Sequence, residues 1–305
     1  MSNDSYVKDI LPPKPEAPLP SDCCGTGCSP CVYDIYEEDL KKWKKSCEQL
    51  KLDDSPKDQQ AIISTNKFTS VKLTGVTQIT NNTFIYQFEL PEKTCLGLQI
   101  GHHIVIKGIL DNKVVLRPYT PINDINSTGM FELMIKLYPK GKMSTILSKL
   151  SIGDQIEIRG PYGSFKYQPN TFKRLVFLAA GTGIAPMFQI IQQILKDEED
   201  MTRLHLMYSS KSFKDILLRE ELYKFQSYWN FTVFHYLSEE NDSKNKKYSE
   251  NVVLRRLTKQ DVKEELLKMF TEETLVLISG TKSFDKDMLN AALDVFDDDK
   301  NIHRF

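Results

Sequence analysis

The chain has 305 residues, of which 40% are hydrophobic and 27% charged, and its formal net charge is −1. The length is enough for two domains with their own cores, and the composition is that of a globular protein. The near-neutral charge gives no bulk attraction to nucleic acid, and no apolar run approaches the roughly 20 residues that span a bilayer. We therefore expect an intracellular, soluble protein of the cytoplasm. Peripheral binding to a membrane and a location in an organelle both remain open. We expect no nucleic-acid partner.

Residues 1–64 form a predicted head that is rich in cysteine and proline. It holds half of the 14 prolines and five of the six cysteines. Within "CCGTGCSPC" the cysteine spacing is similar to that of metal ligands, and the glycines let the chain wrap around an ion. Zinc, an iron–sulfur cluster and a segment of free thiols all remain open. The candidate ligands are Cys23, Cys24, Cys28 and Cys31, with Cys47 as a further candidate.

Residues 65–169 read as an antiparallel β-barrel domain. Short runs of strand-forming residues alternate in polarity and are separated by turn sequences, which is typical of a small barrel. One helix, at 140–150, interrupts them because its apolar residues recur at helical spacing. The expected strands cover 68–79, 83–90, 102–110, 131–138 and 154–160.

Residues 170–305 change to an α/β pattern. Continuous apolar strands alternate with amphipathic helices, which predicts a doubly wound parallel sheet. The expected strands cover 174–180, 204–210, 231–238 and 274–280, and the expected helices cover 186–199, 215–228, 259–270 and 285–296. The predicted fold is therefore a β-barrel followed by an α/β nucleotide-binding domain.

Two glycine turns follow strands of this second domain. In "AAGTGIAPM", Gly181 and Gly183 let the backbone approach a ligand closely, and Pro186 suits the first turn of a helix. The free amides at that helix start favour a phosphate. The second turn, Ser279–Gly280, follows the last expected strand. Both lie at the carboxyl ends of strands, where open α/β sheets bind ligands, so they predict a nucleotide site.

The barrel carries "RPYTP", an unusual stretch for a strand region. Arg117 can hold a phosphate bidentately, Tyr119 offers a ring for stacking, and Thr120 offers a small hydroxyl. Pro118 and the following proline restrict the backbone, so the three side chains keep fixed directions. Phosphate, ring system and polar ring edge together describe a flavin, although a turn that merely packs the tyrosine has the same pattern.

The order of the motifs resembles a known family. "RPYTP", "IKLY", "KGKMS", "RGPYGSF", "AAGTGIAPM", "SGTKSF" and a terminal phenylalanine occur in this order over residues 66–305. This arrangement is similar to the NADH–cytochrome b5 reductase family, within the ferredoxin–NADP reductase-like superfamily. The stretch from "PLPSDCCGTGC" onward resembles the oxidoreductase-like N-terminal segment found before such reductases.

The resemblance implies FAD in the barrel and NADH in the α/β domain, with NADPH left open. It implies that Thr120 and Lys136 stabilise charge on the reduced flavin and act as the catalytic pair. It adds further cofactor-binding residues to those above, at the flavin, the pyrophosphate and the nicotinamide. They are Ile135, Lys136, Tyr138, Gly141, Lys142, Met143, Ser144, Thr182 and Phe305.

The implied function is an FAD-dependent oxidoreductase that takes hydride from NADH and passes single electrons to a cytochrome b5-type haem. Such chemistry belongs to the cofactor, and the protein supplies orientation and tuning. Two alternatives remain. One is a reductase with another acceptor, such as a quinone or an iron–sulfur protein. The other is a non-enzymatic adaptor that binds metal or a partner and retains the fold.

The chain departs from the family pattern in two places. Ser279 stands where the family usually has a cysteine, which suggests slower hydride transfer. Ser238 stands where the family has an acidic residue that selects NADH. Of the neighbouring charges, Glu239 and Glu240 would repel a ribose phosphate, whereas three lysines would attract one. These are Lys244, Lys246 and Lys247. We expect NADH to be preferred.

Overall fold

The computed structural model describes residues 60–269, 273–296 and 299–305, together with residues 15, 17, 36, 37, 40 and 41. The chain divides into two compact units, Met1–Gln59 and Gln60–Phe305, and the second contains both predicted domains. None of the helices in the described part of the chain is long and apolar enough to cross a membrane.

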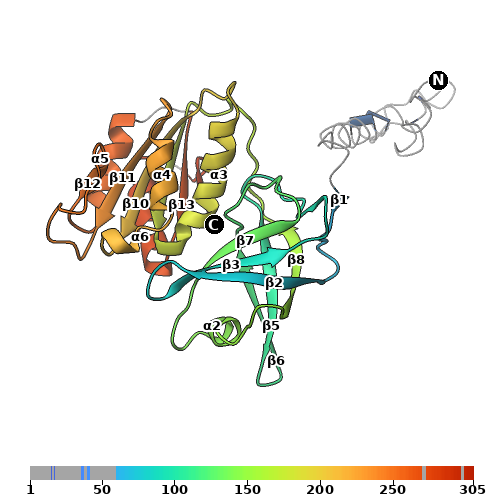
Figure 1. The fold of residues 1–305 in the computed structure, drawn as a ribbon. Helices are drawn as coiled ribbons and strands as arrows, with labels where there is room; N and C mark the ends of the chain where they lie inside the picture. The colour runs from blue at the N-terminus through green and yellow to red at the C-terminus, as the bar shows by residue number, and fades with distance from the viewer. Residues whose placement is uncertain are drawn as a thin grey trace. The chain divides into compact units, whose positions relative to one another are not determined.

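An antiparallel six-stranded sheet forms the first half of this unit (Figure 1). Its order is β6-β5-β8-β2-β3-β7. A bridge between Pro121, just after β6, and Leu133 in β7 connects the two outer strands, so the sheet closes into a barrel. The strands are β2 (Thr69–Gln78), β3 (Thr83–Glu89), β5 (His103–Leu110), β6 (Lys113–Tyr119), β7 (Met130–Lys136) and β8 (Gln155–Tyr162). A small parallel pair, β1 (Gln60–Ala61) and β4 (Thr94–Cys95), lies outside this sheet.

Alternating side chains build the barrel interior. Leu73, Leu133 and Ile158 are fully buried, and the rings of Phe88 and Phe131 stack with centroids 5.1 Å apart. Successive strand residues point to opposite faces, so each strand gives every second side chain to this core. Helix α2 (Lys142–Leu147) adds Met143 and Leu147 to the same core.

Strand β6 was not among the expected strands, because Pro118 within it and Pro121 just after it masked the strand pattern. Pro118 lies within β6 and pairs with Val105 of β5. In the sheet order β6 is an outer strand, so the missing proline N–H interrupts no ladder to a further neighbour. "RPYTP" is therefore the end of a strand and the turn after it, which fixes the directions of its side chains.

The second half is a parallel six-stranded sheet with the order β12-β11-β10-β9-β13-β14 (Figure 1). Its strands are β9 (Arg174–Ala180), β10 (Arg203–Ser210), β11 (Phe231–Leu237), β12 (Asn251–Val253), β13 (Thr274–Ser279) and β14 (Ile302–Arg304). Its helices are α3 (Ile184–Lys196), α4 (Arg219–Phe225), α5 (Lys259–Met269) and α6 (Lys282–Leu293). Strands β12 and β14 were not predicted, because three residues are too few to show a period.

Helices cover both faces of this sheet, as the doubly wound prediction requires. Leu175 and Phe177 of β9 pack with α3 and α4, whereas Val176 and Leu178 pack with α5 and α6. All four side chains are fully buried, which explains why β9 is apolar from Leu175 to Ala180.

Helix α3 joins the sheet to the barrel. The side chain of Gln189 is fully buried, its Oε1 accepts a hydrogen bond from Gly101 N at 2.9 Å, and its Nε2 donates to His102 O at 3.2 Å. Further along α3, Gln193 and Lys196 both contact Asp124 of the barrel domain. These contacts hold the barrel against the start of the sheet and so fix the cleft between them.

Candidate active site

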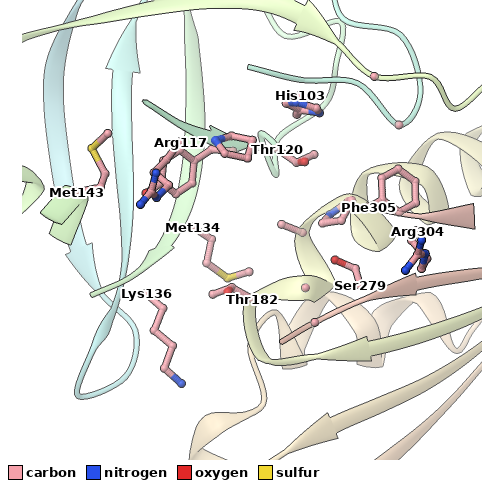
Figure 2. A pocket seen from close by; sticks show the side chains of 18 of the residues that line it. His103, Arg117, Thr120, Met134, Lys136, Met143, Thr182, Ser279, Arg304 and Phe305 are labelled. Atoms are coloured by element: carbon pink, nitrogen blue, oxygen red, sulfur yellow. The ribbon is translucent and has the colours of Figure 1, made fainter. Parts of the chain in front are cut away.

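A cavity of about 540 Å³ lies between the barrel and the carboxyl ends of the parallel strands. Figure 2 shows Arg117, Thr120 and Lys136 on the barrel side, with Thr182 and Ser279 facing them from the sheet side. The cavity is thus built from turns that are far apart in the sequence. Its position matches the ligand crevice of open α/β sheets.

The end of β6 supplies one wall. Tyr119 is partly buried, and burial raises the pKa of its hydroxyl to about 12 although Arg117 lies close by. The ring therefore stays neutral at physiological pH and offers a flat, uncharged face. The Arg117 guanidinium is exposed and donates one hydrogen bond, to the carbonyl of Leu116 at 2.8 Å. Its remaining donors can bind an anion.

The start of α2 supplies the next wall. No side chain caps this helix, so its first amides lack a partner from that source. The hydroxyl of Ser144 accepts from Tyr138 N at 2.9 Å, which folds the preceding turn onto the helix start. A Cβ on Gly141 would lie 2.7 Å from that hydroxyl oxygen. Glycine at this position therefore keeps the turn tight and the amides open to the cavity.

The glycine turn after β9, η2 (Gly181–Gly183), touches the end of β13. A Cβ on Gly183 would lie 2.2 Å from the carbonyl oxygen of Ser279, which no other side chain could fit. Gly181 has φ +53°, and nothing lies within 4 Å of where its Cβ would be. The fully buried Tyr208 donates from its hydroxyl to Gly181 O at 3.0 Å and holds the turn in place.

The C-terminal residue closes the cavity on the sheet side. Phe305 N donates to Ile278 O at 3.0 Å, which extends the pairing of β14 with β13. The Phe305 ring lies with its centroid 5.6 Å from that of Phe165 and 4.7 Å from that of His303. These ring contacts fix the aromatic side chain at the cavity wall (Figure 2).

The residues that line the cavity fit both a flavin dinucleotide and a nicotinamide dinucleotide. Arg117, Lys136, Lys142 and Arg304 line the first cavity, and no aspartate or glutamate of the described residues does. A cationic lining suits the phosphates of FAD and NADH. A Cβ would meet Ser144 Oγ at Gly141 and Ser279 O at Gly183, so glycine is what allows these two turns of the cavity wall to pack tightly against the rest of the chain.

Family models match three parts of the chain. Residues 70–167 match the oxidoreductase FAD-binding domain, and residues 177–290 match the oxidoreductase NAD-binding domain. Residues 9–51 match the N-terminal segment of the oxidoreductase-like proteins. The cofactors expected for the two structured halves, FAD and a nicotinamide dinucleotide, are thereby supported.

The chain is 37% identical over 286 residues to the protein called NADH-cytochrome b5 reductase-like of Homo sapiens, which covers 92% of this chain and 90% of that one. It belongs to the NADH–cytochrome b5 reductase family. NADH-cytochrome b5 reductase 1 of Eremothecium gossypii is 49% identical over 148 residues, 48% of this chain and 52% of its own. The cytochrome b5 reductase domain of Ulva prolifera nitrate reductase superposes with a TM-score of 0.70 at 26% identity, covering 81% of this chain and 100% of that one.

These comparisons confirm the resemblance, the fold class and the enzyme class that the sequence motifs indicated. The reductase places nearly all of the predicted site residues around one cavity. These are Arg117, Pro118, Tyr119, Thr120, Lys136, Tyr138, Gly141, Lys142, Met143, Ser144, Thr182, Gly183, Pro186, Ser279, Gly280 and Phe305. Gly181 lines the adjoining second cavity instead.

The predicted cofactor-binding residues all fall in the described part of the chain, and Ile135 is the one that lines neither cavity. Its side chain is buried in the barrel core, and its neighbours Met134 and Lys136 line the first cavity. Alternation along β7 explains the difference, since adjacent residues face opposite sides. The position of Lys136 therefore already implied that Met134, and not Ile135, faces the cavity.

Several cavity residues were not anticipated from the sequence. His103 and His303 line the first cavity, although their spacing had suggested surface or structural roles. Burial lowers the pKa of both imidazoles, which favours their neutral forms. Gly101, Gly163, Ser164, Ala185 and Arg304 complete the unexpected lining.

A second cavity of about 590 Å³ continues from the first past the ends of β10 and β11. Ser238 lines it, but Glu239 and Glu240 do not. Glu239 pairs with Lys211 at 2.8 Å, and the Glu240 carboxylate accepts from Phe213 N at 3.1 Å. Of the lysines weighed as phosphate ligands, Lys244, Lys246 and Lys247, none lines this cavity.

The predicted metal ligands Cys23, Cys24, Cys28 and Cys31 lie outside the described residues, as does Cys47. Within the described ranges, no group of three or more His, Cys, Asp or Glu side chains is placed to hold a metal ion. The metal content of the head stays a prediction.

Proposed function

We propose that this reductase transfers hydride from NADH to bound FAD and passes the electrons singly to a haem protein of the cytochrome b5 type. The observation that carries the proposal is the first cavity, where the end of β6, the start of α2, the glycine turn after β9 and the C-terminus meet. Direct hydride transfer requires the flavin and the nicotinamide to lie in contact. A single cavity lined by the barrel on one side and by the parallel sheet on the other allows this contact.

FAD, when bound, supplies a ring system that accepts a hydride and can release its two electrons one at a time. The chain contributes orientation. Tyr119 presents a neutral ring, and the pairing of its backbone with Ile104 of β5 fixes its position at the end of β6. Gly183 brings the start of α3 against Ser279, so a nicotinamide dinucleotide can lie close to the barrel wall.

Two polar groups on the barrel wall are our proposed catalytic pair. The hydroxyl of Thr120 can donate or accept a hydrogen bond, and the Lys136 ammonium donates only. Both line the first cavity, and Lys136 makes no ion pair recorded for the described residues. A cation without a carboxylate partner is available to stabilise negative charge that develops next to it.

The cavity walls also limit the entry of water. Met134 and Met143 are buried, and both contribute apolar surface on the barrel side (Figure 2). Phe305 covers the opposite side from its contacts with Phe165 and His303. An apolar enclosure protects a reactive hydride donor from side reactions.

A cytochrome b5-type acceptor is supported by charge and by the names of the relatives. The exposed Arg304 adds a cation at the cavity, which suits an acidic partner surface. The human and the Eremothecium relatives both carry cytochrome b5 in their names.

The test is NADH-driven reduction of purified cytochrome b5, followed at the haem absorbance. We expect reduction that requires the flavoprotein and slows as salt is raised, because exposed charges are screened. A chain that oxidises NADH with a quinone or an iron–sulfur protein, but leaves cytochrome b5 oxidised, would refute the acceptor and retain the reductase.

The cysteine head is proposed to be a separate unit that flavin binding does not need. The family match over residues 9–51 is independent of the FAD-binding match over 70–167. A chain that lacks residues 1–64 should keep FAD, and elemental analysis of the full chain should decide between zinc, iron and no metal. Loss of FAD from a folded truncated chain would contradict this independence.

A further inference from the structure

We propose that the second cavity holds a phosphate on the adenosine ribose, so that the reductase binds NADPH as well as NADH. This inference rests on the proposed function, because it concerns the reductant of the same site. It follows from the residues at the far end of the cavity, where β10 and β11 end.

The second cavity is placed to receive the adenosine half of a nicotinamide dinucleotide. It shares Thr182, Gly183 and Gly280 with the first cavity, so the two form one continuous cleft. From that junction it extends to Lys211, after β10, and to Ser238, after β11. A dinucleotide with its nicotinamide at the junction therefore has room of about 590 Å³ for its other half.

The carboxylate that would favour a free ribose is missing from this end. In dinucleotide folds an acidic side chain typically accepts hydrogen bonds from the ribose hydroxyls, whereas a nearby arginine accommodates a ribose phosphate. Here Ser238 follows β11, and the next two acids are engaged elsewhere. Glu239 faces Lys211 at 2.8 Å, and Glu240 accepts from the backbone of Phe213 at 3.1 Å.

The cations of this cavity outnumber its carboxylates. Lys136, Lys211, Arg256 and Lys259 line it, against Asp215 and Asp287. Lys259 pairs with Asp287 at 3.1 Å, and Asp215 accepts a hydrogen bond from Ser212 Oγ at 2.8 Å. Among the described residues Arg256 has no recorded carboxylate partner, and its exposed guanidinium is free to bind a phosphate bidentately.

Two hydroxyl groups add neutral polar atoms beside these cations. Ser238 is partly buried and lines the cavity, its hydroxyl donates to Ser210 O at 3.4 Å and can still accept, and Ser210 is 8% exposed. The Ser210 hydroxyl lines the cavity beside the Tyr208 hydroxyl, whose own proton is donated to Gly181 O. Serine hydroxyls and an arginine together match the oxygens of a phosphate monoester.

The test measures binding of two adenosine fragments to the purified full-length chain by calorimetry. 2′,5′-ADP carries the ribose phosphate, and 5′-AMP lacks it. We expect 2′,5′-ADP to bind at least about tenfold more tightly than 5′-AMP, a difference that one charge-assisted contact can supply. We also expect it to bind more tightly than its isomer 3′,5′-ADP, which has the same number of phosphates. Equal affinities for 2′,5′-ADP and either reference fragment would overturn the inference.

Variants locate the effect. Arg256→Ala should weaken 2′,5′-ADP by about tenfold and leave 5′-AMP nearly unchanged, and Ser238→Asp should do the same through charge repulsion. Lys244→Ala is the matched control, because this neighbouring lysine pairs with Asp242 at 3.3 Å and does not line the cavity. An Arg256→Ala chain that behaves like the Lys244→Ala chain would overturn the assignment.

These binding results are independent of electron transfer. A chain that prefers 2′,5′-ADP supports the ribose-phosphate site even if its flavin is never reduced, an outcome that refutes only the proposed function. A chain whose flavin is reduced by NADH but which shows no preference for 2′,5′-ADP refutes the ribose-phosphate site alone.

Discussion

Replacing Gln189 with leucine removes the hydrogen bonds that join helix α3 to the barrel. Leucine has nearly the same size, so the change deletes the amide group and leaves little new space. The Gly101 N–H and the His102 carbonyl then lose partners that they now have at 2.9 Å and 3.2 Å. Water cannot replace the lost hydrogen bonds, because the Gln189 side chain is fully buried and Gly101 is buried as well.

The magnitude follows from these two orphaned groups. A buried donor or acceptor without a partner costs about 1–3 kcal/mol, so with two such groups the Gln189→Leu chain should lose about 2–6 kcal/mol of unfolding free energy. The assay is urea denaturation followed by circular dichroism. Flavin reduction by NADH should also slow, because the same contacts fix the cleft between barrel and sheet.

Gln192→Leu is a matched control on the same helix. The Oε1 atom of Gln192 is buried and has no hydrogen-bond partner, so leucine at this position removes an unsatisfied group. We expect the unfolding free energy to stay within about 1 kcal/mol of the parent or to rise. The reasoning is refuted if Gln189→Leu is no more destabilising than Gln192→Leu.

Three further predictions test the cleft and the sheet. Gly183→Ala should abolish NADH binding and cost about 1–3 kcal/mol of stability, because its Cβ would overlap the carbonyl of Ser279; calorimetric titration with unchanged NADH affinity would contradict this. Ser279→Cys should speed flavin reduction by NADH in stopped flow, since it places the family's usual thiol at the end of β13, and an unchanged rate would count against the idea. Burial lowers the pKa of His235 to about 4, whereas an unfolded histidine titrates near 6.5. Protonation therefore favours the unfolded chain, and unfolding free energy should fall between pH 6.5 and about 4; His235→Gln should flatten this decline, and an unaltered slope would exclude His235 as its source.

The sequence predicted features that depend on local pattern. Alternation in β2, β3 and β5 and the continuous apolar run of β9 indicated the two kinds of sheet correctly. The glycine turns after β9 and β13 also predicted a nucleotide site, because the carboxyl ends of parallel strands meet at one edge of the sheet. Arg117 and Tyr119 were predicted as site residues from their residue types, and both line the first cavity.

Features that depend on register or on distant contacts could not be predicted in this way. A shift of one residue separates Met134, which lines the cavity, from Ile135, which lies in the core. The role of Gln189 depends on a contact with residues 88 and 87 positions earlier in the chain. Arg256 lies in the loop before α5, far in sequence from the strand ends that it approaches, so no motif contains it.

The central claim is that the cavity between barrel and sheet brings a flavin and a nicotinamide together. The most direct measurement is a visible absorption spectrum of the purified full-length chain before and after anaerobic addition of NADH. The account predicts flavin bands that bleach on addition of NADH. A colourless protein that cannot be reconstituted with FAD, or flavin bands that NADH leaves unchanged, would contradict it and favour an adaptor that retains the reductase fold.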